Sequence, residues 1–220
     1  SPKSGELLEP MLDDTERSVV AAAVQNIAYL RYEAAGPKLV NMIPNARGEV
    51  FDELADAFRK LGMPTTDILI KKFDAPSNSG NRDVYVKMFK AIGPTIANSI
   101  TKSLEGKSSF ENRDKFKILI ALRNPKVAAV LVKYIDDEAL GELVVDGLVE
   151  LGSISGVPVI TELRKRLKNP GDLNGKERLI KVLGMIKDKR SIAILEAYAQ
   201  DDNERIRAAV DHALLQVRGF

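Results

Sequence analysis

The sequence predicts an all-α protein of the α-solenoid class, a superhelix of about six helix pairs with partial repeats at both ends. A leucine or isoleucine returns every 29 to 32 residues along the chain. These seven repeat anchors are Leu30, Leu61, Ile92, Leu122, Leu151, Leu183 and Leu214. The residue three positions before each anchor is apolar, from Ile27 to Ile180, until Asp211 takes this place in the last repeat. Repeats of this length bury one face against their neighbours, which gives a stack.

Each repeat is predicted to hold two amphipathic helices. Apolar residues recur nine and twelve positions after the anchor, as Leu39 and Met42 do after Leu30, with Thr101 as the exception. Positions spaced in this way share one face of a helix, whereas the alternation of a half-buried strand is absent over any useful length. Glycine directly follows four anchors, where a helix end favours a residue that tolerates the left-handed conformation. These glycines are Gly62, Gly93, Gly152 and Gly184.

The spacing predicts one repeat domain over residues 1–220. The first helices of the repeats are expected at 14–31, 46–61, 81–92, 111–123, 137–151, 174–185 and 202–218. With the second helices between them, the repeats cover 14–44, 46–75, 81–106, 111–135, 137–168 and 174–200, followed by the final helix at 202–218. Segments rich in Gly, Asn, Ser and Pro, such as 74–82, are expected as loops on one edge of the stack.

The repeats in the second half of the chain have a recognisable pattern. Leu151-Gly152-Ser153-Ile154 leads to Val159, Ile160 and Leu163, and Leu183-Gly184-Met185-Ile186 leads to Ile192 and Leu195. Residues 201–209 place acidic residues before a helix with an early Arg and Ala pair. These segments resemble the short HEAT-like repeats of bilin-lyase-type α-solenoids. The resemblance covers nearly the whole chain and implies a HEAT-like fold, in a family that includes scaffolds, adaptors, nucleic-acid binders and a few enzymes.

Composition excludes several classes of protein. The net charge is +2, from 33 basic and 31 acidic residues, so no bulk attraction to nucleic acid or anionic lipid is expected. The absence of cysteine excludes disulfides, thiolate metal sites and cysteine nucleophiles. No apolar run approaches the length of a membrane span. The composition leaves the compartment open, with the cytoplasm favoured.

The first residues predict that the natural N-terminus lies further upstream. The segment 7–12 has the apolar spacing of a second helix and leads into Asp13-Asp14, just as 194–200 leads into Asp201-Asp202. Upstream sequence could hold the missing partner helix, more repeats, or a signal or membrane anchor, which would place the protein in the periplasm or at a membrane. The alternative is that residues 1–10 form a disordered tail that only imitates a helix.

The expected binding surface is a discontinuous set of mostly basic side chains on the second helices, which we call the basic face. Its residues are Asn41, Lys71, Lys72, Lys102, Lys133, Lys165 and Arg166. They stand at positions directed away from the core, toward the concave side of a HEAT-like stack, where solenoids hold extended ligands. An acidic peptide or acidic protein surface is the expected partner. The alternative is that these are ordinary lysines on exposed helix faces.

A second candidate surface is an acidic strip along one helix, with carboxylates four residues apart. It consists of Glu138, Glu142, Asp146 and Glu150. Like charges at this spacing repel each other, so compensation is expected. Lysines on the neighbouring first helices would supply it, namely Lys115, Lys117, Lys176 and Lys181. The strip is then internal or solvated, and the alternative is that it binds a partner.

No catalytic, cofactor-binding or metal-binding residue is expected. His212 is the only histidine, and the several His-Glu pairs that HEAT-repeat iron hydroxylases require are absent. Gly106-Lys107-Ser108 imitates the end of a P-loop, but Thr101 replaces its first glycine. We therefore expect a non-enzymatic scaffold or adaptor that binds another protein, without a cofactor or a small-molecule substrate. The alternative is a nucleic-acid-binding solenoid that uses the basic face.

Overall fold

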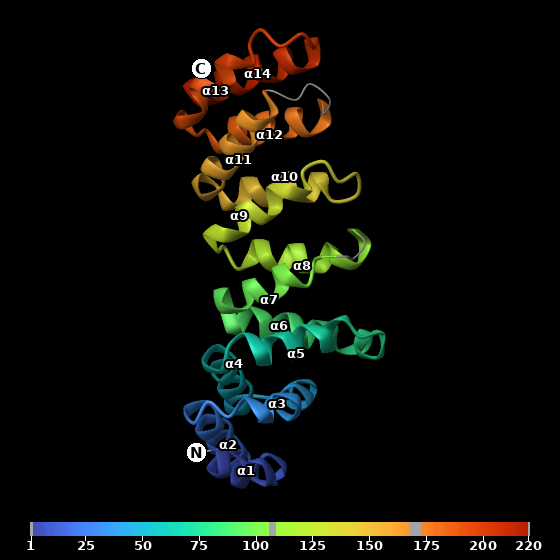
Figure 1. Cartoon of the computed structure of the whole chain (residues 1–220), viewed down its shortest axis with the longest axis vertical. Helices are drawn as coiled ribbons and strands as arrows, with labels where there is room; N and C mark the ends of the chain where they lie inside the picture. The colour runs from blue at the N-terminus through green and yellow to red at the C-terminus, as the bar shows by residue number, and fades with distance from the viewer. Residues whose placement is uncertain (1, 106–108, 168–172, 220) are drawn as a thin grey trace. The chain divides into compact units, whose positions relative to one another are not determined.

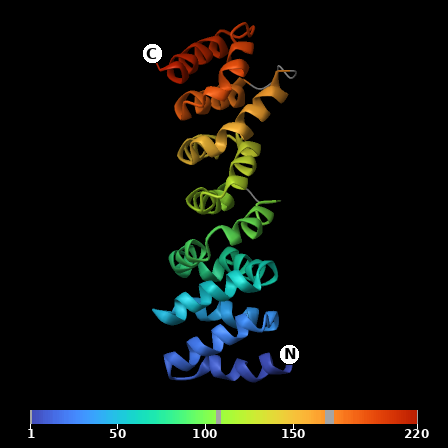
Figure 2. The ribbon, with the colours of Figure 1, turned by 90° about the vertical axis from the view of Figure 1, so that its left-hand side faces the viewer.

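The computed structural model describes residues 2–105, 109–167 and 173–219, and within these ranges the chain is helical with no β-strand. The chain divides into two compact units, unit 1 at residues 1–105 and unit 2 at residues 106–220. Helix pairs stack within each unit (Figures 1 and 2). The predicted all-α, helical-repeat solenoid fold is therefore confirmed. None of the helices in the described ranges is both long and apolar enough to span a bilayer.

Unit 1 contains three helix pairs and an additional helical segment at its N-terminal end. The pairs are α2 (Arg17–Tyr29) with α3 (Gly36–Met42), α4 (Glu49–Leu61) with α5 (Met63–Asp74), and α6 (Arg82–Ile92) with α7 (Ala97–Lys102). First helices pack on first helices, α2 on α4 and α4 on α6, and second helices pack in the same way from α3 to α7. The additional segment is α1 (Pro2–Leu8) and the 3-10 helix η1 (Glu9–Asp13), which pack on α2.

Unit 2 repeats this arrangement. Its pairs are α8 (Ser109–Ala121) with α9 (Pro125–Leu131), α10 (Gly141–Leu151) with α11 (Ser153–Arg166), and α12 (Leu173–Ile186) with α13 (Ile192–Ala197), followed by α14 (Glu204–Arg218). The first helices α8, α10, α12 and α14 pack in series, and so do the second helices α9, α11 and α13. The observed first helices fall within a few residues of those that the repeat spacing predicts.

The predicted apolar columns form the cores of the units. The column three residues before the anchor is fully buried from Ile27 to Ile180, and Asp211 in the last repeat is exposed. In unit 1 the rings of Phe73 and Phe89 meet edge to face with centroids 5.1 Å apart, which joins a second helix to the next first helix. Burial between neighbouring repeats, which removes this apolar surface from water, therefore holds each unit together.

The glycines that follow the anchors serve two different purposes. Gly62, Gly93 and Gly152 have φ of 76°, 73° and 60° and begin the turn to the second helix, as predicted. The prediction is wrong for Gly184, which lies inside α12. A Cβ on Gly184 would lie 2.9 Å from the Cα of Ala213, so this glycine allows α14 to pack closely against α12.

We predict that Phe89→Ala lowers the free energy of unfolding of unit 1 by ~3–5 kcal/mol, because it leaves a cavity between α5 and α6. Chemical denaturation followed by circular dichroism measures the change. The control is Asp211→Ala in unit 2, which changes an exposed side chain and is expected to shift stability by less than ~0.5 kcal/mol. Equal effects of the two substitutions would show that the apolar columns are wrongly assigned.

Candidate functional site

In unit 1 the basic face lies toward the C-terminal ends of the second helices. Asn41 on α3 and Lys71 on α5 are exposed, and Lys72 is half-buried. Lys102, the last residue of α7, is exposed, and its Nζ lies 3.0 Å from Oδ2 of Asp67 on α5. One of the predicted cations is therefore paired within the unit.

Asp67 reduces the positive charge of this surface. Burial raises the pKa of the Asp67 carboxyl, but the hydrogen bond from Ser99 and the charges of Lys102 and Lys71 lower it by more, so the pKa lies below its ordinary value. The carboxyl is consequently ionised at neutral pH. The basic face of unit 1 therefore contains an ionised carboxylate close to Lys71 and Lys102.

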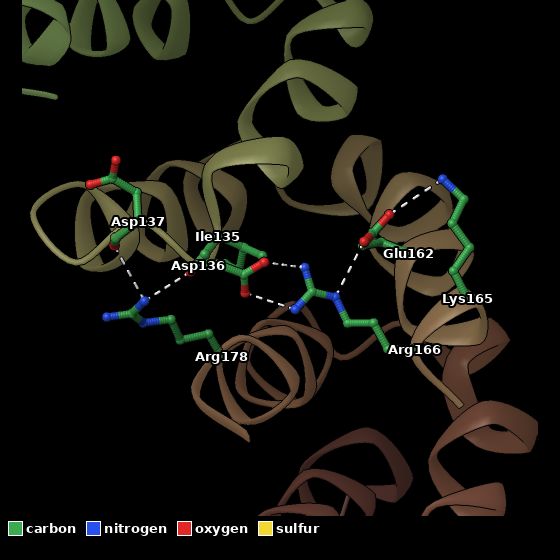
Figure 3. A network of polar contacts seen from close by, with 7 residues as sticks. All are labelled: Ile135, Asp136, Asp137, Glu162, Lys165, Arg166 and Arg178. Carbon is green, nitrogen blue, oxygen red and sulfur yellow. Dashed lines mark hydrogen bonds and ion pairs between the residues drawn. The ribbon is translucent and has the colours of Figure 1, made fainter. Parts of the chain in front are cut away.

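In unit 2 the predicted binding residue Arg166 is part of an internal network (Figure 3). Its Nη1 and Nη2 donate to the two carboxylate oxygens of Asp136 at 2.7 Å, and its Nε donates to Oε1 of Glu162 at 3.2 Å. The side chain is only 12% exposed. Two parallel bonds to one carboxylate are among the strong hydrogen bonds of proteins. Arg166 therefore ties α11 to the loop before α10.

The same loop is held from its other side by Arg178 of α12. Its Nη1 donates to the carbonyl oxygens of Ile135, at 2.8 Å, and Asp137, at 3.4 Å (Figure 3). The remaining members of the basic face in unit 2 are exposed. Lys165 pairs with Glu162 at 3.3 Å, whereas Lys133 has no ion pair with any described residue.

The acidic strip is exposed, and only one of its members is compensated as expected. Glu142 pairs with Lys181 at 3.8 Å and with Arg178 at 3.1 Å. The other three carboxylates have no ion pair within the described part of the chain; they are Glu138, Asp146 and Glu150.

Two of the lysines expected beside the acidic strip lie elsewhere, which corrects that prediction. Lys115 and Lys176 are buried on α8 and α12. The Nζ of Lys176 lies 3.7 Å from Asp201 and 5.7 Å from the centre of the Tyr198 ring. An aspartate before α14 thus neutralises a charge inside the stack, because a buried ammonium requires a partner.

The remaining candidates from the sequence concern catalysis, metal binding and phosphate binding. His212 is exposed on α14, as expected from its outward position. The described residues include no group of three His, Cys, Asp or Glu side chains that could hold a metal ion. The P-loop imitation at Gly106-Lys107-Ser108 lies outside the described residues.

A groove that the sequence does not reveal lies on the edge of unit 1 where the first helices begin. It consists of two adjoining hollows of about 410 Å³ and 450 Å³, which share Ala46 and Arg47 in the loop before α4. The first hollow lies between the beginnings of α2 and α4, and the second lies between the beginnings of α4 and α6. We call the two hollows together the loop-edge groove. Asn41 of the basic face lines it.

Internal contacts fix the walls of the loop-edge groove. Lys38 donates to Asp13 Oδ2 at 2.6 Å and to the carbonyl oxygen of Glu9 at 2.7 Å, which joins α3 to η1. Arg47 donates to the carbonyl oxygens of Pro44 and Ala46 at 3.0 and 2.6 Å. The groove is therefore preformed, which lowers the entropic cost of binding a ligand there.

The lining of the loop-edge groove combines both charges with apolar surface. Arg17 and Lys87 are exposed and have no ion pair with a described residue, and the same holds for Asp52 and Asp83. Apolar surface comes from Met42, Val50, Phe51 and Val84. No side-chain cap occupies the beginnings of α2, α4 and α6. First-turn N–H groups at such helix ends suit carbonyl or carboxylate oxygens.

The sequence does not reveal this groove because three different repeats build it. The available signal was local: Pro44 and Gly48 bracket a short loop, and Gly48 adopts φ of 54° before α4. That signal predicts a turn, but it does not reveal that the turn separates two hollows.

The comparisons with known proteins concern the fold alone. The chain matches no protein-family model and no curated protein sequence. Among solved structures, human deoxyhypusine hydroxylase in complex with glycerol is similar at 16% identity and a TM-score of 0.47, over 100% of this chain and 86% of that chain. An engineered protein is similar at 15% identity and a TM-score of 0.37, over 98% of this chain and 97% of that one. A designed armadillo repeat protein is similar at 13% identity and a TM-score of 0.34, over 96% and 98%.

The expectation that the chain is not an enzyme is corrected. Deoxyhypusine hydroxylase is an enzyme, and a helical-repeat fold does not by itself imply whether a protein catalyses a reaction.

We predict that Arg166→Ala lowers the free energy of unfolding by about 1–3 kcal/mol, because it leaves Asp136 and Glu162 without their shared partner. Lys133→Ala changes an exposed lysine of the same face that has no ion pair with a described residue; it is the control and should leave stability within ~0.5 kcal/mol. Urea denaturation of both variants measures the difference. An Arg166→Ala variant as stable as the parent would show that this network is not structural.

Proposed function

We propose that this chain is a scaffold or adaptor that binds another protein, and that it holds an extended segment of that protein in the loop-edge groove. The observation that carries the proposal is that the two hollows adjoin at Ala46 and Arg47 and together extend along the beginnings of three helix pairs. An extended polypeptide spans several repeats in this way, whereas a compact small molecule fills one hollow.

The charges of the loop-edge groove favour a polypeptide over a nucleic acid. Asp52 and Asp83 lie in the same lining as Arg17 and Lys87. Phosphates along a nucleic-acid backbone would be repelled by these carboxylates, whereas a peptide offers acidic, basic and apolar side chains in turn. Uncapped helix beginnings and exposed carboxamides such as Asn41 add hydrogen-bonding groups for a peptide backbone.

The basic face extends the proposed surface beyond the groove. Asn41 on α3 lines the groove, and α5, which carries Lys71 and Lys72, packs beside α3. Acidic residues of the bound protein would contact these lysines and Lys102. Lys133 and Lys165 are the exposed lysines of the basic face in unit 2. Arg166 is left out of this set, because its guanidinium is already bound by Asp136 and Glu162.

We also propose that the repeats are of the short HEAT-like type found in bilin-lyase-type solenoids. Burial of Leu151, Leu163, Leu183 and Leu195, the residues on which the resemblance depends, supports this assignment. Tetrapyrrole chemistry is not part of the proposal.

The test begins with peptides selected from a random display library on the intact protein. We predict that the double variant Arg17→Glu, Lys87→Glu binds a selected peptide at least about tenfold more weakly than the parent, since both cations line the groove. Fluorescence anisotropy with the labelled peptide measures the affinity. The matched control is Lys117→Glu, Lys126→Glu, which reverses two exposed lysines of unit 2.

Two further measurements, and one outcome of the measurement above, separate the alternatives. Lys71→Glu, Lys102→Glu tests whether the basic face contributes to binding of the same peptide. Undiminished affinity of the Arg17→Glu, Lys87→Glu variant would remove the groove from the binding surface. Tighter binding of an oligonucleotide than of any selected peptide, with an affinity that falls steeply with salt, would favour nucleic acid instead.

A further inference from the structure

The first hollow of the loop-edge groove, between the beginnings of α2 and α4, offers a cation to a ligand. Two of its carboxylates already have contacts within the chain. Asp13 is paired with Lys38 at 2.6 Å. Asp14 accepts a hydrogen bond at Oδ1 from the backbone N–H of Glu16 at 2.8 Å. Arg17, the first residue of α2, is exposed in the same lining and forms no ion pair with a described residue.

Arg47 adds a second cation where the two hollows adjoin. Its Nη1 donates to the carbonyl oxygens of Pro44 and Ala46, which hold the guanidinium group but do not neutralise its charge. Arg17 and Arg47 line the first hollow from α2 and from the loop before α4. Guanidinium groups bind carboxylates with paired N–H donors. The first hollow therefore suits an acidic side chain.

The second hollow, between the beginnings of α4 and α6, has a carboxylate on each of these two helices. Asp52 stands nine residues before the anchor Leu61, and Asp83 stands nine residues before Ile92, so they occupy equivalent positions of consecutive repeats. Both line the hollow, both are exposed, and neither pairs with a cation in the described ranges. Two carboxylates that line one hollow attract a cation between them. The second hollow therefore suits a basic side chain.

Lys87 gives the groove a positive charge at its other end. It stands on α6, one turn after Asp83, where it is exposed and has no ion pair with a described residue. Helices α2, α4 and α6 follow one another in unit 1 (Figure 1), so the charges that are open to a ligand run positive, negative, positive. A segment that complements them is acidic, basic and acidic in turn.

The repeat geometry sets the distance between the first acidic side chain and the basic one. Packed helices lie about 8–10 Å apart, and the two hollows are therefore separated by about the same distance. An extended polypeptide advances about 3.1–3.4 Å per residue, so about three residues cover this distance. In a polyproline II segment, side chains three residues apart also point to the same side.

We propose that the segment bound in the loop-edge groove carries a basic residue between two acidic residues. Its basic side chain lies between Asp52 and Asp83. One acidic side chain, about three residues away, lies between Arg17 and Arg47. The other acidic side chain contacts Lys87. This specificity rests on the proposed function, because the same groove must hold the peptide.

An exchange of charges between the protein and a peptide selected on the intact protein tests the pattern. Asp52→Lys, Asp83→Lys is expected to bind the selected peptide at least about tenfold more weakly than the parent, because both carboxylates contact its basic residue. Replacing that basic residue of the peptide by Glu should weaken binding to the parent and restore binding to the variant. Fluorescence anisotropy measures the four affinities. The matched control is Asp146→Lys, Glu150→Lys, which reverses two exposed carboxylates of α10 and should leave them unchanged.

The milder variant Asp52→Asn, Asp83→Asn removes the same charges with little change in size, and it should also weaken binding of the selected peptide. Selected peptides without a basic residue would overturn the proposal, and so would a Glu-substituted peptide that the lysine variant fails to bind. If Arg17→Glu, Lys87→Glu weakens binding but both aspartate variants bind as the parent does, the groove holds the peptide and only the charge pattern is wrong. If none of these substitutions has an effect, the proposed function of the groove fails as well.

Discussion

The fold of each unit depends on the burial of apolar columns between neighbouring helix pairs. A helix pair on its own would expose two apolar surfaces to water: the column three residues before the anchor, and the columns of its second helix. These surfaces become buried only when the next pair packs against them. Several second helices are short, such as α7 (Ala97–Lys102) and α13 (Ile192–Ala197), and helices of this length are not stable alone. Packing therefore makes these short segments helical, and the buried columns determine where the exposed edges of the helix stack lie.

The surfaces proposed for binding are the parts of the repeat that the columns leave free. The columns fix how α2, α4 and α6 lie side by side, and the spacing between the beginnings of these helices creates the two hollows of the loop-edge groove. Polar contacts refine the result: Lys38 joins α3 to η1 in unit 1, and Arg166 and Arg178 hold the loop before α10 in unit 2. Positive charges that complete such contacts are unavailable to a partner, whereas exposed Lys71 and Lys133 remain available.

The sequence predicted the helices well, because their apolar periodicity is a local pattern. The helix expected at 46–61 is observed as α4 (Glu49–Leu61), and the expected column from Ile27 to Ile180 is buried. Properties that depend on contacts between repeats were not predictable in this way. The sequence pattern predicts a helix end at Gly184, but this glycine lies inside α12, where the close approach of Ala213 leaves no room for a side chain. The sequence pattern places Lys176 beside the exposed acidic strip, but its side chain is buried. Asp201, in the loop before the next first helix, neutralises the charge of its ammonium group there. The loop-edge groove combines residues from three repeats, and therefore no single repeat reveals it.

Native-state hydrogen exchange compares the effect of packing with that of helix length most directly. Helix α14 has 15 residues and an Asn203 side-chain cap, whereas α10 has 11 residues and no side-chain cap. Helix α10 packs between two first helices, α8 and α12, and also against the second helices α9 and α11. Helix α14 packs against the first helix α12 and the second helix α13. If burial between neighbours holds the units together, the amides at the centre of α10 will exchange more slowly than those at the centre of α14. Slower exchange in the longer, better capped α14 would contradict this account, because it would show that the helices owe their stability to local structure.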